Sequence, residues 1–477
     1  LLASGFSRKL RSKLFRKVED MSMSEIKEFS PNSLITRTTN DITQVEMFIG
    51  FGLQLLIKAP ITAVWAITKI LNKSWEWSMV TAVAVVILLL VIGILTIIVM
   101  PKFKIVQKLT DKLNEVTREN LMGIRVVRAF NAEEYQQEKF QNVNNSLTNL
   151  QLFNQKAMSI MAPVMYLVMY MLTLVIYFIG AYLIKDALMA DKIALFGDMV
   201  VFSSYAMQII MSFLMLAMIF MILPRAQVSA SRINEVLDTR LSVIDGNVTN
   251  KDEVGTVEFR NVSFKYPDAE EYVLKNISYK ANKGDTIAFI GSTGSGKSTL
   301  VNLIVRFYDV TDGEILIDGV NIKDYKLEYL YKLIGYVPQR AVMFNGTVNS
   351  NINYGEAMEE ISDKKIVEAA RVAQADEFIS KMDDGYESHV AQGGTNVSGG
   401  QKQRLAIARS IAKNPEIYIF DDSFSALDYK TDAVLRSELK KYTKDATSLI
   451  VAQRIGTIMN ADKIIVLDNG ESVGVGT

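Results

Sequence analysis

The stretch Gly291-Ser-Thr-Gly-Ser-Gly-Lys-Ser298 decides how the second half of this chain folds. It matches the phosphate-binding loop, in which two glycines flank four residues and a lysine and a serine follow. An apolar run at Thr286–Ile290 comes directly before it, and a helical pattern at about 297–307 comes directly after it. Because the motif requires a strand before the loop and a helix after it, this context argues against the alternative, a chance glycine-rich turn. The sequence therefore predicts an α/β domain that binds a nucleotide.

Each residue type in this loop suits a triphosphate. Glycines allow backbone N–H groups to close around the phosphates, and the helix N-terminus adds a favourable dipole. We expect Lys297 to reach the β- and γ-phosphates and the Ser298 hydroxyl to bind Mg²⁺. ATP and Mg²⁺ are therefore the cofactors that the sequence predicts.

Two further motifs fit the same chemistry. Asp421 and Asp422 follow the apolar strand Ile417–Phe420, and an acid in that place is what Mg²⁺ needs opposite the phosphate loop. An acid at the end of a strand is common, so this motif indicates a Mg²⁺ site only in combination with the phosphate loop. The third motif, Ser398-Gly-Gly-Gln401, opens a helical run, and two glycines at a helix start offer backbone donors to an anion.

Four apolar runs precede these motifs, and each reaches the ~20 residues that cross a bilayer. They lie at about Ile49–Leu71, Met79–Met100, Ala162–Ile184 and Met199–Leu223. The first contains Lys58 and Lys69, and because a lysine at bilayer depth is costly, a buried soluble helix is the alternative for that run. Lys58 and Gln208 are the polar residues to watch inside the spans, although a neighbouring helix or snorkelling would satisfy either.

The charges that flank these runs orient them in the membrane. Basic residues precede the first run and follow the second, and such stretches belong in the cytoplasm. They are Arg8, Lys9, Arg11, Lys13, Arg16, Lys17, Lys102, Lys104 and Lys108. The loops 72–78 and 185–198 then face outward, where Trp75 and Trp77 fit an interfacial aromatic belt. A helical pattern over about Pro101–Lys156 predicts that the spans continue as helices into the cytoplasm, where the ATP motifs also lie.

Composition narrows the chemistry further. The 477 residues include no cysteine and one histidine, His389, so we expect no disulfide and no cysteine- or histidine-based metal site. The formal net charge is zero, which argues neither for nor against nucleic acid, and we expect no nucleic-acid partner. We interpret both ends, Leu1 and Thr477, as truncated.

Together these motifs resemble the ATP-binding cassette (ABC) family, and the resemblance covers essentially the whole chain. Ser398–Gln401 resembles the signature motif specific to that family, and the order of spans, linker and nucleotide domain resembles bacterial multidrug and lipid exporters. The resemblance implies an α-helical transmembrane domain (1–225) with six spans per half, a linker (226–253) and an α/β P-loop nucleotide-binding domain (254–477). The first span and most of the second would precede Leu1. It also implies a multi-pass protein of the cytoplasmic membrane, with the nucleotide-binding domain in the cytoplasm.

The resemblance also assigns the residues that would hold ATP. In this class two nucleotide domains meet head to tail, and each ATP lies between the phosphate loop of one and the signature of the other. The loop residues so implied are Gly291, Ser292, Thr293, Gly294, Ser295, Gly296, Lys297, Ser298 and Thr299, and the signature residues are Ser398, Gly399, Gly400 and Gln401. Tyr266 resembles the aromatic residue that stacks on adenine, although a plain strand tyrosine would give the same pattern.

Other positions match family residues that act on the ion, the water or the membrane domain. Ser298, Gln339 and Asp421 would bind Mg²⁺, and Gln339 would also sense the attacking water. Ser425–Asp428 resembles the loop that communicates across the dimer. Asn32–Arg37 and Gly123–Phe130 fall where coupling helices dock on the nucleotide domains, with ordinary helix packing as the alternative.

Two positions depart from the family pattern, and both fall in the same ATP site. Asp422 stands where the family has a glutamate that polarises the attacking water, and its side chain is one carbon shorter. Gln453 stands where the family has a histidine that contacts the γ-phosphate, and an amide cannot carry a positive charge. A misplacement of about 1 Å can cost about 10²-fold in rate. This site should therefore bind ATP and hydrolyse it slowly, which resembles the degenerate-site subunit of a heterodimeric exporter; engineered substitutions or a slow homodimer are the alternatives.

The transported compound is poorly specified. Methionines at helical spacing, such as Met161, Met165 and Met169, would suit a promiscuous hydrophobic pocket, but helix packing or lipid contact is the preferred interpretation. The leading function is ATP-driven export of amphipathic, hydrophobic compounds by a pair of half-transporters in the lipid bilayer. Lipid or peptide export by the same machinery is one alternative, and an ATP-gated channel or regulatory subunit is another.

Overall fold

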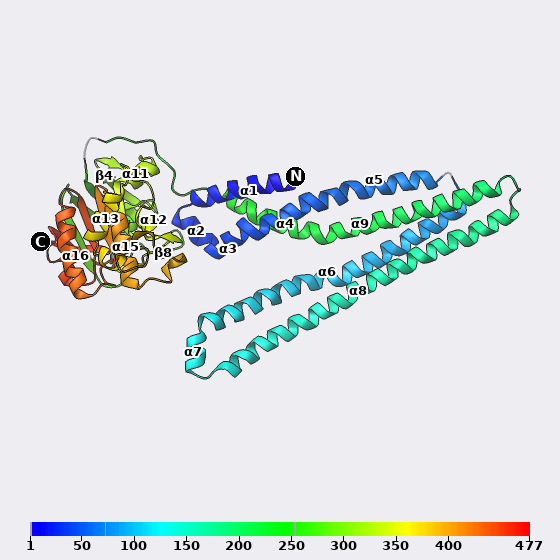
Figure 1. Cartoon of the computed structure of the whole chain (residues 1–477), viewed down its shortest axis with the longest axis horizontal. Coiled ribbons are helices and arrows are strands. Elements are labelled where there is room, and N and C mark those ends of the chain that lie inside the picture. The colour runs from blue at the N-terminus through cyan, green and yellow to red at the C-terminus, as the bar shows by residue number, and fades with distance from the viewer. Residues whose placement is uncertain (1, 72, 252–253) are drawn as a thin grey trace. The chain divides into compact units, whose positions relative to one another are not determined.

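The chain forms two compact units in a computed structural model, which describes residues 2–71, 73–251 and 254–477. One unit comprises Leu1–Lys13 and Thr36–Glu235, and we call it the helical unit. The other comprises Leu14–Ile35 and Val236–Thr477, and we call it the nucleotide unit. Figure 1 labels several of their helices and strands.

Long helices make up the helical unit (Figure 1). Its elements, some of which run on into the other unit, are α1 (Leu2–Glu19), the π-helical turns η1 (Arg37–Asp41) and η2 (Phe48–Gly52), α4 (Ile42–Met47), α5 (Leu53–Ile70), α6 (Trp75–Met122), α7 (Ile124–Ala129), α8 (Glu133–Asp186) and α9 (Lys192–Asp238). α6 and α8 pack along one another and are joined by the short α7. α9 continues to Asp238, so the segment expected to be the linker begins as a helix.

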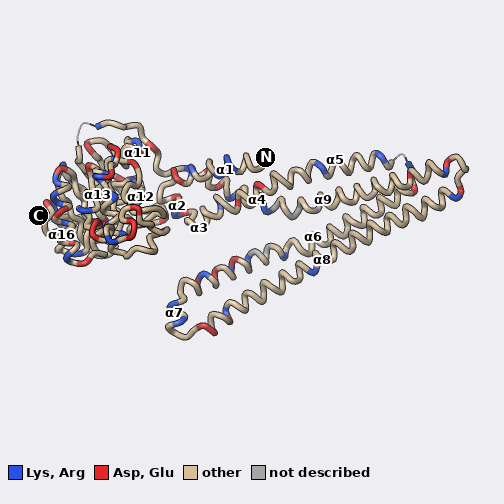
Figure 2. Tube along the Cα trace, in the orientation of Figure 1, with Lys and Arg blue, Asp and Glu red and all other residues tan. Residues whose placement is uncertain are grey.

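Within the described residues, four helices are long and apolar enough to cross a membrane: Pro31–Ile70, Trp75–Met122, Glu133–Asp186 and Lys192–Leu216. Each overlaps one of the four apolar runs predicted from the sequence. Figure 2 shows charged residues gathered in the parts of α6 and α8 nearest α7, beyond their apolar runs. The polar stretch between the second and third runs is therefore helical, as the periodicity predicts.

A small core holds the four spans together. Trp77 and Phe202 are almost fully buried and lie with ring centroids 5.4 Å apart. Met165 and Met169 are buried in the same cluster, which agrees with the preferred interpretation of the methionines as packing residues. Trp75 is 72% exposed, but Trp77 is buried against the neighbouring helices. The prediction of an interfacial role was therefore wrong for Trp77.

The nucleotide unit contains a six-stranded sheet in the order β12-β11-β3-β10-β9-β6. Its strands are β3 (Thr286–Gly291), β6 (Ile334–Val337), β9 (Ile417–Asp421), β10 (Thr447–Val451), β11 (Lys463–Asp468) and β12 (Glu471–Gly476). All are parallel to their neighbours except β12, which pairs antiparallel at the edge. Every residue of β9 and β10 is buried, because helices cover both faces of such a sheet.

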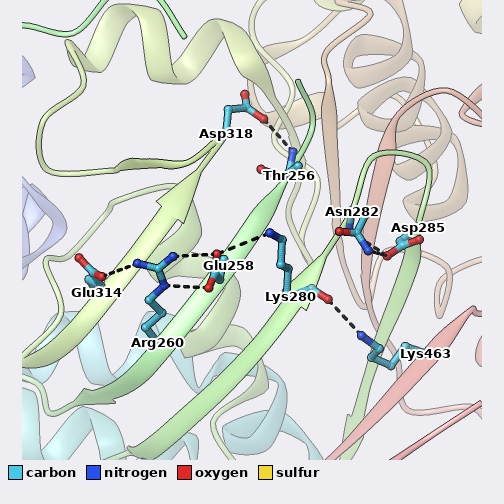
Figure 3. A network of polar contacts seen from close by, with 9 residues as sticks. All are labelled: Thr256, Glu258, Arg260, Lys280, Asn282, Asp285, Glu314, Asp318 and Lys463. Carbon is cyan, nitrogen blue, oxygen red and sulfur yellow. Dashed lines mark hydrogen bonds and ion pairs between the residues drawn. The ribbon is translucent and has the colours of Figure 1, made fainter. Parts of the chain in front are cut away.

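An antiparallel sheet in the order β2-β1-β4-β5 stands beside it. Its strands are β1 (Val257–Phe264), β2 (Leu274–Ala281), β4 (Asp312–Ile317) and β5 (Val320–Asn321), and β7 (Gly346–Thr347) pairs separately with β8 (His389–Val390). Figure 3 shows a polar network across β1, β2 and β4, in which Arg260 pairs with Glu258 and Glu314. These side chains lie near the surface, so they favour the strand register more than they add stability.

The nucleotide unit also contains the remaining helices, of which α2 and α3 lie to one side of the sheets (Figure 1). They are α2 (Met23–Phe29), α3 (Pro31–Thr36), α10 (Lys297–Ile304), α11 (Leu327–Leu333), α12 (Val348–Ile352), α13 (Asp363–Val372), α14 (Asp376–Ile379), α15 (Gly399–Ala412), α16 (Tyr429–Tyr442) and α17 (Ile455–Ile458), with 3-10 turns η3 (Gly385–Glu387) and η4 (Gln392–Gly394). Glu25 ties α2 to the chain after α9, because its carboxylate accepts the backbone N–H of Ser22 at 2.7 Å and that of Ser242 at 3.1 Å.

Candidate nucleotide-binding site

Four parallel strands deliver the predicted site residues to one edge of the six-stranded sheet. β3 ends at the phosphate loop and β9 ends at Asp421. β6 ends two residues before Gln339, and β10 ends two residues before Gln453. Ligands of open α/β sheets bind outside the carboxyl ends of the strands. The topology therefore explains why residues far apart in sequence meet here.

The phosphate loop needs glycine where its backbone turns. Gly294 and Gly296 have φ angles of +87° and +96°, which side-chain-bearing residues rarely adopt. A Cβ on Gly296 would also lie 2.7 Å from Leu274 Cδ2, which would have to shift, and 3.0 Å from the Val273 oxygen, which is a tight contact. The loop then passes directly into α10, whose N-terminus offers backbone N–H donors to an anion.

Lys297 lies inside the loop that precedes it. Its ammonium donates to the backbone oxygens of Gly291 and Ser292 at 2.9 and 2.6 Å, and to Ser295 Oγ at 3.2 Å. Burial lowers the pKa of the Lys297 ammonium, while the nearby carboxylates of Asp422 and Asp421 act in the opposite direction. A cation held among backbone carbonyls is ready to exchange them for phosphate oxygens, which are stronger acceptors.

Ser298 and Asp421 meet as the ion-binding prediction requires. The Ser298 hydroxyl donates to Asp421 Oδ1 at 3.0 Å, and only 5% of Asp421 is exposed. Burial raises the pKa of Asp421, as does the charge of Asp422, and the Ser298 hydrogen bond opposes the rise. A hydroxyl and a carboxylate are the hard oxygen donors that Mg²⁺ prefers, so these residues fit the ion. Bound there, Mg²⁺ would neutralise charge on the phosphates.

Asp422 is held by both glutamines of the site. Its Oδ2 accepts from Gln453 Nε2 at 3.0 Å and from Gln339 Nε2 at 3.3 Å. Its backbone has φ +45°, and its N–H donates to the Val451 oxygen at 3.0 Å. Asp422, Gln339 and Gln453, three residues singled out from the sequence, therefore form one connected hydrogen-bonded group, and the carboxylate at its centre is 8% exposed.

Tyr266 lies against the helix that carries the phosphate loop. Its hydroxyl lies 3.0 Å from Thr299 Oγ1, and its ring makes edge contacts with Phe264 and Tyr308 at centroid distances of 5.0 and 5.3 Å. These contacts fix the ring beside α10. The stacking of adenine on Tyr266 stays a prediction, because a plain packed tyrosine would make the same contacts.

The signature motif is separate from the group just described. Ser398 caps α15, with its backbone N–H donating to Gln401 Oε1 at 2.8 Å and the Gln401 N–H donating back to Ser398 Oγ at 3.3 Å. The polar groups of Ser398 and Gln401 therefore bond to each other. Ser398 and Gly399 are exposed to solvent, which leaves the start of α15 open to another molecule.

Two features of the site were not visible in the sequence. Ser423 is fully buried, and its hydroxyl donates to the Val337 oxygen at 2.9 Å, which ties the end of β9 to the end of β6. Lys27 of α2 lies 5.7 Å from the Tyr266 ring centroid and pairs with Asp268 at 2.9 Å. Both depend on long-range strand and helix pairing, so no local sequence pattern predicts them.

Comparison with known proteins identifies this arrangement. The chain matches the family model described as "ABC transporter transmembrane region" over residues 1–213 and the one described as "ABC transporter" over residues 274–425. It is 41% identical over 480 residues to an uncharacterized ABC transporter ATP-binding protein of Mycobacterium tuberculosis, covering 99% of this chain and 81% of that protein. The chain belongs to the ABC transporter family.

Two further comparisons indicate the type of ABC transporter. The chain is 33% identical over 477 residues to the ATP-dependent lipid A-core flippase of Pseudomonas aeruginosa, covering 99% of this chain and 77% of that protein. It resembles the structure of a bacterial Atm1-family ABC exporter with ATP bound, with a TM-score of 0.80, 25% identity, and coverage of 100% of this chain and 82% of that one. The protein is an ABC exporter half-transporter, a multi-pass membrane protein with a membrane domain and an ATP-hydrolysing domain.

Proposed function

We propose that this half-transporter is the slowly hydrolysing subunit of a heterodimer that exports amphipathic, hydrophobic compounds across the cytoplasmic membrane. Mg²⁺-ATP on its own phosphate loop would be bound firmly and hydrolysed slowly. The observation that carries this proposal is the closed hydrogen-bonded group in which both glutamines, Gln339 and Gln453, donate to Asp422.

The geometry of that group supports slow hydrolysis. A general base must accept a proton from the attacking water within hydrogen-bonding reach. Asp422 is shorter than the expected glutamate, and its Oδ2 already accepts two amide donors. Gln453 donates to that carboxylate rather than carrying charge toward the γ-phosphate. Binding, by contrast, depends on Lys297, Ser298 and the loop, which are complete.

The exposed signature supports a partner with its own phosphate loop. Ser398 and Gly399 are exposed at the start of α15, and a Cβ on Gly399 would meet nothing within 4 Å. The backbone N–H groups of Gly399 and Gly400 would therefore be free to approach a phosphate, while those of Ser398 and Gln401 stay in the capping pair. This chain would thus complete a second ATP site on the partner, and that site would carry most of the turnover.

An exposed apolar helix end supports coupling through α7. Val126 and Phe130 in and directly after α7 are 60% and 79% exposed, which is unusual for large apolar side chains outside a membrane span. We propose that this segment docks on a nucleotide domain and passes its closure to α6 and α8. Asn32–Arg37 is proposed to serve the same purpose.

Lipid export is the second candidate function. Its support is the identity of 33% to a protein named as a lipid A-core flippase across nearly the whole chain. Both candidates share an amphipathic cargo, and they differ in whether the cargo is resident in the bilayer.

The test is to restore hydrolysis to this site. The full-length chain would be co-expressed with its partner half-transporter, whose phosphate-loop lysine is replaced so that only this site can turn over. We expect Asp422→Glu with Gln453→His to raise turnover at this site by about 10–100-fold, while Asp422→Asn with Gln453→His leaves it slow. A wild-type chain that purifies alone as a dimer with rapid ATP turnover would reject the proposal.

A further inference from the structure

The four predicted spans contain two positive charges and no negative charge. Lys58 and Lys69 both lie in the first run, and the other three runs contain neither lysine, arginine, aspartate nor glutamate. Among the described residues of the helical unit, ion pairs join other side chains and leave these two ammonium groups without one. Lys69 instead lies 4.8 Å from the ring centroid of Trp65. Charges at this depth are costly unless they face a partner charge or a water-filled path.

Both lysines lie on one face of α5. Gln54, Lys58, Thr62, Trp65 and Lys69 follow one another at intervals of three or four residues, so they form a polar stripe along the helix. Four of the five are exposed, and Thr62 is half-buried. Lys58 and Lys69 are about 16 Å apart along the helix axis, at ~1.5 Å per residue.

The polar stripe borders the packed face of α5. Leu55, Ala59, Ala63, Ala66 and Ile70 are buried, and the three alanines among them are small enough to allow close approach of a neighbouring helix. At 3.6 residues per turn, this buried face lies about 100° around the helix from the lysine stripe. The stripe therefore begins where the packing of this half-transporter ends.

The opposite side of the stripe is apolar and exposed. Ile57, Ile61 and Val64 are 59%, 64% and 61% exposed. An apolar arc of this kind suits lipid tails or the apolar body of a cargo. α5 thus presents cations and apolar side chains next to each other, which is the pattern that an amphiphile with an acidic group would match.

The two lysines differ in their expected depth in the membrane. Lys69 is one residue from the end of α5 at Ile70, where its ammonium can reach the outer interface. Lys58 is twelve residues from that end, about 18 Å along the axis, within a hydrocarbon layer of about 30 Å. Snorkelling therefore explains Lys69 alone, and Lys58 needs a counter-charge or a water-filled path near the middle of the membrane.

We propose that Lys58 binds the acidic group of an anionic amphiphile and that Lys69 receives it nearer the outer surface. The cargo class is an apolar body with a carboxylate or phosphate group, and the body lies along Ile57 and Ile61. This inference rests on the proposed export function and narrows its substrate. The same chemistry is found in an anionic membrane lipid and in an anionic drug-like compound, so the experiment separates these two sources.

The test compares two head groups in the intact transporter. The full-length chain and its partner would be reconstituted in proteoliposomes that contain labelled phosphatidylglycerol, or labelled phosphatidylcholine with the same acyl chains. A parallel arm uses a soluble anionic amphiphilic dye. We expect Lys58→Gln to raise the half-saturating concentration of the anionic cargo about tenfold, because a desolvated charge pair is lost, and to change that of phosphatidylcholine by less than about twofold.

Matched variants separate charge from folding. Lys58→Arg keeps the charge and should keep the head-group preference, and Lys185→Gln removes an exposed charge directly after the apolar run Ala162–Ile184 and should behave like the wild type. A preference for labelled phosphatidylglycerol assigns the cargo to membrane lipids, and a preference confined to the dye assigns it to soluble amphiphiles. Equal losses for both head groups, or an unchanged preference in Lys58→Gln while the wild type transports, would overturn the inference alone. A wild type that moves no amphiphile with ATP would overturn the export function itself.

Discussion

Strands β9 and β10 of the nucleotide unit are buried at every residue, whereas only 17–39% of the most apolar window of each span is buried within this chain. In the nucleotide unit, helices and a second sheet cover the strands, and the site residues are anchored by contacts made inside the unit. Along the spans, most large apolar side chains face outward, where lipid or a partner half would cover them. The phosphate-loop side of the ATP site is therefore built by this chain alone, while the transport path depends on what lies beside it.

Of these predictions, removing the lysine of the phosphate loop should have the largest effect, a loss of ATP binding. Unchanged binding would contradict the contrast between the nucleotide unit and the spans. Lys297 is expected to exchange its three loop acceptors for phosphate oxygens, and each charge-assisted bond contributes about 1.5–3 kcal/mol. We expect Lys297→Met to weaken ATP binding at this site about 100-fold or more, measured by titration of a fluorescent ATP analogue. Lys323→Met, an exposed lysine of the same unit, is the control and should leave binding unchanged.

A substitution in the core between the spans tests whether these helices pack against one another within this chain. Phe202 is fully buried against Trp77, so Phe202→Ala leaves a cavity. Because lipid is as apolar as the core, the transfer free energy lost with the phenyl ring is smaller than it would be in a water-soluble protein. We therefore expect the free energy of unfolding to fall by about 2 kcal/mol. Phe178→Ala removes a side chain that is 77% exposed and should cost less than about 0.5 kcal/mol. Thermal unfolding midpoints in detergent would measure both, and equal shifts would contradict a packed core within one chain.

The same contrast explains how much the sequence could predict. The phosphate loop, Asp421 and the signature are contiguous motifs whose neighbours along the chain already give the strand and helix, so their placement could be foreseen. The buried state of Trp77 could not, because tryptophan before an apolar run suits both an interface and a core. The hydrogen bonds of Gln339 and Gln453 to Asp422 depend on the order of parallel strands, which no local pattern contains.

The pH dependence of stability offers a smaller effect inside the nucleotide unit. Lys413, after α15, donates to the oxygens of Tyr331 and Ile334 at 2.5 and 2.9 Å, and burial lowers the pKa of its ammonium to about 8. The unfolded chain, with a pKa of about 10.4 for lysine, binds more protons than the folded protein above pH 8. The free energy of unfolding should therefore rise between about pH 8 and 10 by roughly 1–2 kcal/mol relative to Lys413→Met. A flat difference across that range would show that Lys413 stays charged when folded.

The smallest effect is expected at the ion pair of Lys27 with Asp268, beside Tyr266. The two groups are 2.9 Å apart, and the pKa of Lys27 is raised by this hydrogen bond, but both side chains are more than 60% exposed. Exposed pairs contribute little and are screened by salt. Lys27→Met should therefore weaken ATP binding less than about threefold, with the difference vanishing at high ionic strength, and Lys27→Asp with Asp268→Lys should recover it. A tenfold, salt-independent loss would mean that α2, a helix from the N-terminal part of the chain, holds Tyr266 in place. The ATP site would then depend on a segment outside the contiguous nucleotide motifs, and the contrast with the spans would be weaker.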